Sequence, residues 1–289
     1  MVQAESSTQP ERIRQAFAYT AELAGHYENF TVVSWLLPRK LRPHFVNVYA
    51  FCRHADDLAD ETGDPQQAQR LLMKLRDDVQ RMYDGEPGEL IEVALQQTVR
   101  QFNIPPDPFL KLIDAFLQDQ RVSRYETYEQ VADYCRRSAD PVGHLVLYLC
   151  GYGDAERQRL SDFTCTGLQL ANFWQDVGND LSRGRIYIPR EDMARFGVRE
   201  EDIVAKRFTP EFAGMMEFEV KRTLELFEKG EALLPMVRRR VRTDVALYGR
   251  GGRAVLAAIR RIGYNTLEHR PTIGRWTKLS LLARYLIGL

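Results

Sequence analysis

The chain has 289 residues, a mass of 33.5 kDa, 44% apolar and 28% charged residues, and equal numbers of acidic and basic side chains. This balance is typical of a folded globular protein and excludes disordered and fibrous classes. The four cysteines lie far apart in the sequence, so neither a disulfide framework nor a zinc site is indicated. No apolar run approaches the roughly 18 residues of a spanning helix.

Apolar residues recur with the period of a helix along the chain, and no segment alternates with the period of a strand. Residues 1–12 are predicted to form a disordered polar tail, and residues 13–289 a single all-α domain. The connections are short and coincide with glycine and proline, which favours one domain over two. The predicted helices cover residues 15–26, 43–61, 65–83, 90–102, 107–118, 128–138, 142–151, 155–181, 210–242, 251–266 and 277–286.

The first candidate site lies on the predicted helix 43–61. Asp60 follows Asp56 by four residues and Asp57 by three, so it shares a helix face with each of them. Like charges at this spacing cost an isolated helix about 0.2–0.5 kcal/mol per pair. The motif is therefore either a solvated acidic face or a cation-binding site.

The second candidate site lies on the predicted helix 155–181. Gln169, Asn172, Asp176 and Asp180 line one stripe at intervals of three or four residues, opposite apolar positions such as Phe173. An unpaired carboxylate on a core helix is costly. Oxygen ligands select hard cations such as Mg²⁺, which completes its shell with water and substrate phosphate. Together the two motifs predict Mg²⁺ held against a diphosphate by Asp56, Asp57, Asp60, Asn172, Asp176 and Asp180.

Three further segments accompany these motifs: Tyr49–Arg53 before the first, Tyr134–Gly143 between the two, and Gly184–Pro189 after the second. In this order they resemble the squalene/phytoene synthase family of head-to-head prenyl transferases, over residues 26–270. The resemblance implies an α-helical isoprenoid-synthase fold, with a central cavity between the two aspartate motifs. It also implies Mg²⁺ as cofactor and a prenyl diphosphate, either presqualene diphosphate or farnesyl diphosphate, as substrate.

The same resemblance implies roles for individual residues. Mg²⁺ and catalysis would rest on Asp56, Asp60, Asp176 and Asp180, with Gln169 and Asn172 in support. Diphosphate contact would come from Ser34, Arg53 and Arg270, and a polar pair facing the cavity from Asp119 and Gln120. Tyr134 would lie near the reacting carbons, where a ring face stabilises cations. Simpler alternatives are a helix cap for Ser34, ion pairs with Asp56 and Asp57 for Arg53, and ordinary core packing for Tyr134.

Within the family, residues 26–30, 34–38 and 172–176 are most similar to the branch that serves bacterial hopanoid synthesis. That branch converts presqualene diphosphate and water to hydroxysqualene and pyrophosphate. One departure is Gln175, where many relatives carry arginine. No NADPH is expected, because the glycine-rich residues 249–254 follow no strand and lack a dinucleotide-binding unit around them. Other enzymes of the squalene pathway are expected partners.

Two alternatives stay open from the sequence. One is the condensation of two farnesyl diphosphates to presqualene diphosphate, squalene or a carotenoid precursor. The other is a non-catalytic helical protein that docks on membranes, because residues 231–289 carry 12 Lys or Arg against 3 Asp or Glu. No nucleic-acid recognition motif accompanies this basic segment, which favours anionic lipid over nucleic acid. Residues 1–10 show no secretory or transit signal, so the expected location is the cytoplasm, with peripheral contact at the inner membrane surface.

Overall fold

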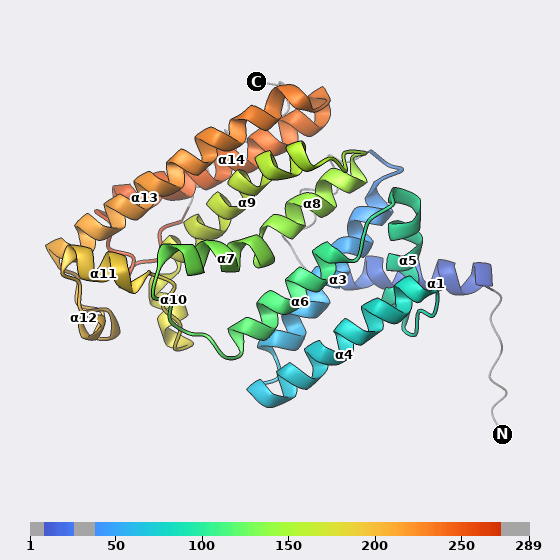
Figure 1. The fold of residues 1–289 in the computed structure, drawn as a ribbon, viewed down its shortest axis with the longest axis horizontal. Coiled ribbons are helices and arrows are strands. Elements are labelled where there is room, and N and C mark those ends of the chain that lie inside the picture. The colour runs from blue at the N-terminus through green and yellow to red at the C-terminus, as the bar shows by residue number, and fades with distance from the viewer. Residues whose placement is uncertain (1–8, 26–37, 273–289) are drawn as a thin grey trace. The chain divides into compact units, whose positions relative to one another are not determined.

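The computed structural model describes residues 9–25 and 38–272, and every regular element within these ranges is a helix (Figure 1). The all-α prediction is therefore confirmed. The helices form two compact units. Unit 1 contains residues up to Arg121 together with His144–Gly153, and unit 2 contains Val122–Gly143 and the residues from Asp154 onward. The predicted helix 277–286 and the candidate residue Ser34 lie outside the described residues.

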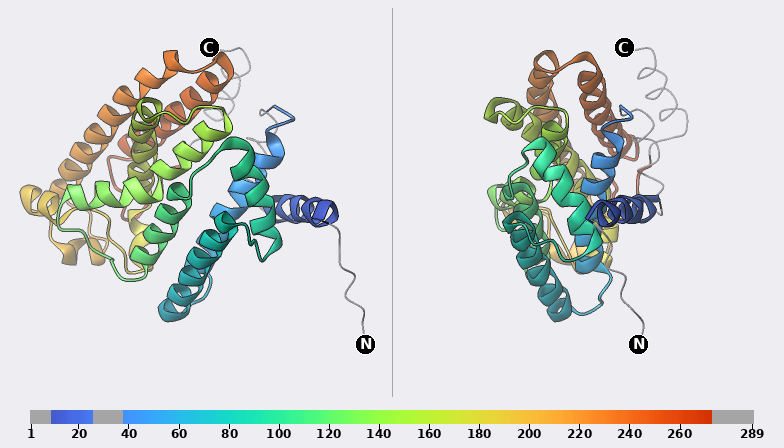
Figure 2. Two further views of the ribbon diagram at one scale, coloured as in Figure 1. Left: turned by 45° about the vertical axis from the view of Figure 1, so that its right-hand side comes forward. Right: turned by 90° about the vertical axis from the view of Figure 1, so that its right-hand side faces the viewer.

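Unit 1 is built around a core of large apolar side chains. Phe51 and Phe109 meet edge to face with ring centroids 5.0 Å apart, and Leu72 and Ile113 are fully buried beside them. The helix α1, dark blue in Figure 2, packs against α3 and α5. The helices of this unit are α1 (Gln9–Gly25), α3 (Arg42–Asp60), α4 (Pro65–Asp84), α5 (Leu90–Phe102), α6 (Asp107–Asp119) and the second half of α8 (Asp140–Leu149).

A buried polar network fixes α3 against its neighbours. Asn47 on α3 accepts a hydrogen bond from Thr20 on α1 at 2.6 Å. Its amide nitrogen donates to the Ala94 carbonyl at 3.1 Å and to the Thr98 hydroxyl at 3.0 Å, both on α5. Because buried polar groups are costly when unpaired, a rotation of α3 would break all three bonds. The network thus fixes the rotation of α3 about its axis, and with it the direction in which the first aspartate motif points.

Unit 2 is organised around the long helix α9, which packs against α13 and α14 (Figure 1). Trp174 on α9 is fully buried, and its indole N–H donates to the Thr223 hydroxyl on α13 at 2.9 Å. The helices of this unit are α7 (Tyr128–Ser138), the start of α8, α9 (Ala155–Gln175), α10 (Val177–Ser182), α11 (Arg190–Phe196), α12 (Glu200–Val204), α13 (Pro210–Gly230), the 3₁₀ helix η1 (Glu231–Met236) and α14 (Arg239–Arg261).

The structure differs from the predicted elements at several places. Helices α11 and α12 were not predicted, and α14 continues through residues 243–250, which separate two of the predicted helices. Helix α1 begins at Gln9, so residues 9–12 are helical rather than part of a tail; Pro10 and Glu11 suit a first helical turn. The predicted helix 210–242 divides into α13, η1 and α14, because Pro235 cannot donate a helical hydrogen bond. The predicted helix 155–181 is interrupted at Asp176.

None of the helices in the described part of the chain is both long enough and apolar enough to cross a membrane.

Candidate active site

The first aspartate motif occupies the last turns of α3, as predicted. The Arg53 guanidinium binds Asp56 with an Nη1–Oδ2 distance of 2.6 Å and Asp57 with an Nη2–Oδ1 distance of 3.0 Å. All three side chains are partly exposed. The ion pairs that helical spacing allows for Arg53 are thus present, and a diphosphate contact by Arg53 stays a prediction.

The candidate polar pair lies where α6 ends. Asp119 is the last residue of α6, and Gln120 caps it. The amide nitrogen of Gln120 donates to the Ala59 carbonyl at 3.2 Å and to the Phe116 carbonyl at 3.3 Å. Since Ala59 precedes Asp60, Gln120 ties the end of α6 to the turn of α3 that carries the first motif. No sequence pattern indicated this contact.

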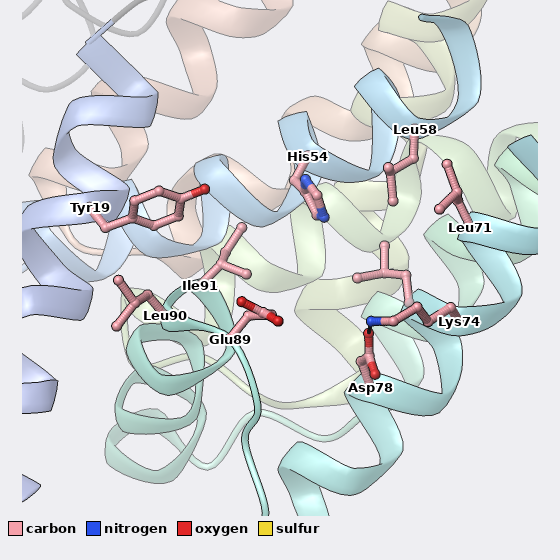
Figure 3. Close-up of a pocket in the computed structure, with 10 residues that line it drawn as sticks. Tyr19, His54, Leu58, Leu71, Lys74, Asp78, Glu89, Leu90 and Ile91 are labelled. Carbon is pink, nitrogen blue, oxygen red and sulfur yellow. Dashed lines mark hydrogen bonds and ion pairs between the residues drawn. The ribbon is translucent and has the colours of Figure 1, made fainter. Parts of the chain in front are cut away.

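A pocket of about 420 Å³ borders α3 at His54 and Leu58. Figure 3 shows His54 pointing from α3 toward the ion pair of Lys74 and Asp78, whose Nζ–Oδ2 distance is 2.7 Å. Burial lowers the pKa of His54 below its ordinary value. Two residues further on, Asp56 projects from another side of the helix because successive positions turn by about 100°. The residues that line the pocket include none of the carboxylates of the first motif, although Asp57, three residues after His54, shares its helix face.

The second aspartate motif is bent. Helix α9 ends at Gln175, Asp176 has φ −105° and ψ 14°, and α10 begins at Val177. The Gly178 N–H donates to the Thr266 carbonyl at 3.2 Å. A Cβ on Gly178 would lie 2.4 Å from the Leu267 carbonyl oxygen, so only glycine permits this approach. The predicted helix 155–181 is therefore interrupted at Asp176, while the N–H groups of Asp176 and Asp180 still donate to the carbonyls four residues before them.

Residues 266–271, here called the strap, lie against the second motif although they are far from it in the sequence. Arg270 binds both carboxylate oxygens of Asp176, through Nε and through Nη2, the latter at 3.0 Å from Oδ2. Gln175 donates from its side-chain nitrogen to the Pro271 carbonyl at 2.6 Å. The hydrogen bond to Asp176 and the negative charges of Asp176 and Asp180 raise the pKa of Arg270. The family resemblance identified Arg270 as a candidate residue. Its contact with Asp176 and the contact of Gln175 with Pro271 were not predictable from local spacing.

The remaining residues of the second motif keep the expected faces. Gln169 and Asn172 lie on the last turns of α9, with Asn172 exposed, whereas Ala171, Phe173 and Val177 are buried. Asp180 lies in α10, and its N–H donates to the Asp176 carbonyl at 2.8 Å.

Tyr134 is buried in a cluster of aromatic rings. Its ring centroid lies 5.9 Å from that of Phe173 and 5.8 Å from that of Tyr187, and these two rings stack on each other at 3.8 Å. Tyr125 stacks on Tyr187 from another side at 5.7 Å. Tyr187 is held by the pairing of residues 186–191 with residues 123–126. Phe173 and Tyr187 belong to the sequence motifs, but no local pattern predicts their contact with Tyr134.

The donor chemistry of the two motifs fits Mg²⁺. Within residues 9–25 and 38–272 no group of three or more His, Cys, Asp or Glu side chains is arranged to hold a metal ion. Mg²⁺ usually takes only one or two carboxylates and relies on water and substrate phosphate for the rest of its shell. Carboxylate pairs such as Asp56 with Asp60, and Asp176 with Asp180, suit that requirement, and the assignment of metal ligands stays a prediction.

Comparison with known families matches residues 23–277 to the squalene/phytoene synthase model. The chain therefore belongs to the squalene/phytoene synthase family, a family of head-to-head prenyl-diphosphate condensing enzymes that are typically Mg²⁺-dependent. Its fold is the all-helical isoprenoid-synthase fold, as the resemblance implied.

Individual relatives refine this placement. The structure of squalene synthase HpnC from Alicyclobacillus acidocaldarius is 48% identical, with a TM-score of 0.83 over 88% of this chain and 96% of that one. A dehydrosqualene synthase in complex with a ligand is 25% identical, with a TM-score of 0.85 over 97% and 98% of the two chains. Phytoene synthase from Thermus thermophilus is 30% identical over 263 residues, covering 91% and 89%.

Proposed function

We propose that this enzyme converts presqualene diphosphate and water to hydroxysqualene and pyrophosphate. The observation that carries the proposal is the 48% identity to squalene synthase HpnC, nearly twice the identity to the dehydrosqualene synthase of the same fold. Gln175 stands where many relatives carry arginine, and it donates to the Pro271 carbonyl. This contact supports a second motif whose contacts near the diphosphate differ from those of such relatives. The proposed step breaks the bond between carbon and diphosphate oxygen, forms a bond to water oxygen after rearrangement, and releases one proton.

The side chains have distinct tasks in this reaction. When bound, Mg²⁺ supplies positive charge that stabilises the departing pyrophosphate. Asp56, Asp60, Asp176 and Asp180 would hold it, with Asp57 and Asn172 as further oxygen donors. Arg53 and Arg270 carry guanidinium groups suited to phosphate oxygens. Gln169 and Asn172 would support the second motif, and Asp119 and Gln120 would face the cavity as a polar pair in contact with the substrate.

The aromatic cluster suits a carbocation. Tyr134 is backed by the stacked pair of Phe173 and Tyr187, which fixes its ring. Aromatic faces attract cations, with a gain of about 2 kcal/mol or more when the site excludes water. Tyr134 therefore presents the ring that would stabilise the rearranging cation before water attacks.

The test is an incubation of purified protein with presqualene diphosphate and Mg²⁺, without NADPH, followed by mass spectrometry of the products. Hydroxysqualene is expected, and EDTA should abolish its formation. Squalene formed only with NADPH would contradict the proposed water quench, and equal product with EDTA would contradict the role of Mg²⁺.

A second candidate is the condensation of two farnesyl diphosphates to presqualene diphosphate, squalene or a carotenoid precursor. The similarity to phytoene and dehydrosqualene synthases favours it. Incubation with farnesyl diphosphate as sole substrate separates the two, because the first proposal gives no product from it.

We also propose a cytoplasmic enzyme with peripheral contact at the inner membrane surface, where its apolar substrate and other squalene-pathway enzymes would be met. Arg238, Arg239 and Arg240 are exposed where α14 begins, in a first turn without acidic residues. Exposed basic clusters bind anionic lipid. A purely non-catalytic docking protein, the third alternative, predicts that Asp56→Asn and Asp176→Asn change nothing measurable.

A further inference from the structure

Three contacts from separate residues fasten the strap to the second motif. The Thr266 carbonyl accepts from the Gly178 N–H at 3.2 Å, Arg270 binds Asp176 through two nitrogens, and the Pro271 carbonyl accepts from Gln175 at 2.6 Å. All belong to unit 2. The two backbone contacts on either side of Arg270 therefore bring its guanidinium within reach of Asp176.

In this contact the guanidinium of Arg270 binds both carboxylate oxygens of Asp176. The Asp176 side chain is 13% exposed, whereas that of Arg270 is 52% exposed. A largely buried carboxylate is costly without a hydrogen-bonded or charged partner, whereas a half-exposed guanidinium is already partly hydrated and gains hydration when it leaves the contact. Hence Arg270 is the member of the pair that can leave the contact at the smaller cost in free energy.

We propose that Arg270 is an internal cation that occupies Asp176 until a divalent metal replaces it, and that Gln175 is the positioning residue that holds Arg270 there. This proposal rests on the assignment of Asp176 as a metal ligand under the proposed function. A metal ion that takes one Asp176 oxygen competes with the guanidinium contact at that oxygen and ends the two-nitrogen binding by Arg270. The strap then carries a free positive charge beside the second motif.

Gln175 is suited to this task because it is neutral. Its amide N–H binds the carbonyl of Pro271, the residue next to Arg270, without adding a second positive charge near Asp176. Proline has no N–H and a fixed φ, so its carbonyl is the group by which the strap can be held at this point. Loss of the Gln175 bond would free the end of the strap while leaving the charges of the site unchanged.

The competition is measurable with a metal alone. Mn²⁺ is a hard divalent cation, and electron paramagnetic resonance detects it when it is free in solution. The titration contains no diphosphate, so any effect of Arg270 on Mn²⁺ affinity does not come from a contact between Arg270 and phosphate. Arg270→Gln should bind Mn²⁺ about 3–10-fold more tightly than the wild type, as expected for the loss of a competing ion pair of about 1 kcal/mol. Arg270→Lys should give an intermediate affinity, since an ammonium cannot bind both oxygens in the same plane.

Gln175→Leu should shift the Mn²⁺ affinity in the same direction by a smaller factor, and it should have no further effect in the Arg270→Gln background. That non-additivity is the signature of a residue acting through Arg270. Arg261→Gln, which removes one exposed positive charge from the end of α14, is the matched control and should leave the affinity unchanged.

Asp176→Asn should abolish the difference in Mn²⁺ affinity that Arg270→Gln produces, which assigns the competition to this carboxylate. Equal Mn²⁺ affinities of wild type and Arg270→Gln, including undetectable binding by both, overturn the proposal. If Arg270→Gln does not fold, the comparison of Arg270→Lys and Gln175→Leu with wild type decides it. A failure to form hydroxysqualene would overturn the proposed reaction alone, because the titration contains no substrate.

Discussion

Glu219 on α13 is an acidic residue with no exposed surface. The guanidinium of Arg222 binds the Glu219 carboxyl group with an Nη2–Oε2 distance of 2.6 Å and the Asp192 carboxylate with an Nη2–Oδ2 distance of 2.7 Å. The same guanidinium lies 3.6 Å from the centroid of the Tyr128 ring. Burial raises the pKa of Glu219 to about 8, against the opposing effect of Arg222. The Glu219 backbone carbonyl accepts from the Thr223 hydroxyl, which in turn accepts from the Trp174 indole.

The sign of its pH dependence follows from proton binding. Between the ordinary pKa near 4.5 and the raised value near 8, the folded protein binds more protons at Glu219 than the unfolded chain. Stability contributed by this group is therefore greatest below about pH 4.5 and is lost as the pH rises toward 8. The unfolding free energy should fall by roughly 1–2 kcal/mol between pH 6 and pH 8.

Glu219→Gln should remove this pH dependence while keeping the side-chain volume. Thermal unfolding at pH 6, 7 and 8 measures it: the wild-type melting temperature should decline by a few degrees more than that of the variant. Parallel declines of the two proteins would show that Glu219 does not titrate in this range.

At the scale of elements, α13 and α14 meet at Phe227. Gly252 on α14 lies against this ring, and a Cβ there would be 2.2 Å from Phe227 Cζ. Because the ring is 2% exposed, it has little room to move. Gly249, one turn earlier on α14, has no atom within 4 Å of a Cβ position. The two glycines form a matched pair on one helix.

Gly252→Ala should destabilise the protein by about 1–3 kcal/mol through overpacking. Gly249→Ala should instead stabilise it by about 0.5–1 kcal/mol, because alanine loses less backbone entropy in a helix. Chemical denaturation of both variants measures the difference. Equal effects of the two substitutions would mean that the contact with Phe227 does not constrain the packing of α13 and α14.

The interruption at Asp176 shows which features of these elements the sequence could predict. Periodicity located α3 and α9 and placed the aspartates on their faces, because those patterns are local. The bend depends on the Thr266 carbonyl, 88 residues beyond Gly178, and no local pattern encodes that partner. The same holds for Gln120 on the Ala59 carbonyl and for Tyr187 on Phe173. Side-chain types were predictable at the candidate site, whereas most of their partners were not.

At the scale of the whole molecule, the balanced net charge conceals a basic segment. Residues 231–289 carry a net +9, and the remainder carries −9. A positive residue near an anionic lipid surface contributes about 1 kcal/mol to binding. Because positive charge in the first turn of a helix opposes the helix dipole, the arginines that begin α14 do not stabilise that helix.

Replacing Arg238, Arg239 and Arg240 with Glu should weaken binding to phosphatidylserine vesicles at least about tenfold. The control replaces the exposed Arg121, Arg159 and Lys206 with Glu, which changes the net charge equally. Sedimentation with vesicles measures both. Equal losses would assign the binding to net charge alone.

The burial of Trp174 also makes the second motif observable in solution. The chain has three tryptophans, and replacement of Trp35 and Trp276 with Phe leaves Trp174 as the single indole emitter. Its N–H is bound to Thr223, and it lies two residues before Asp176. Changes in its emission during a metal titration would report the state of the α9 end directly, so the enzyme carries an intrinsic fluorescent reporter at the site where cation exchange is proposed.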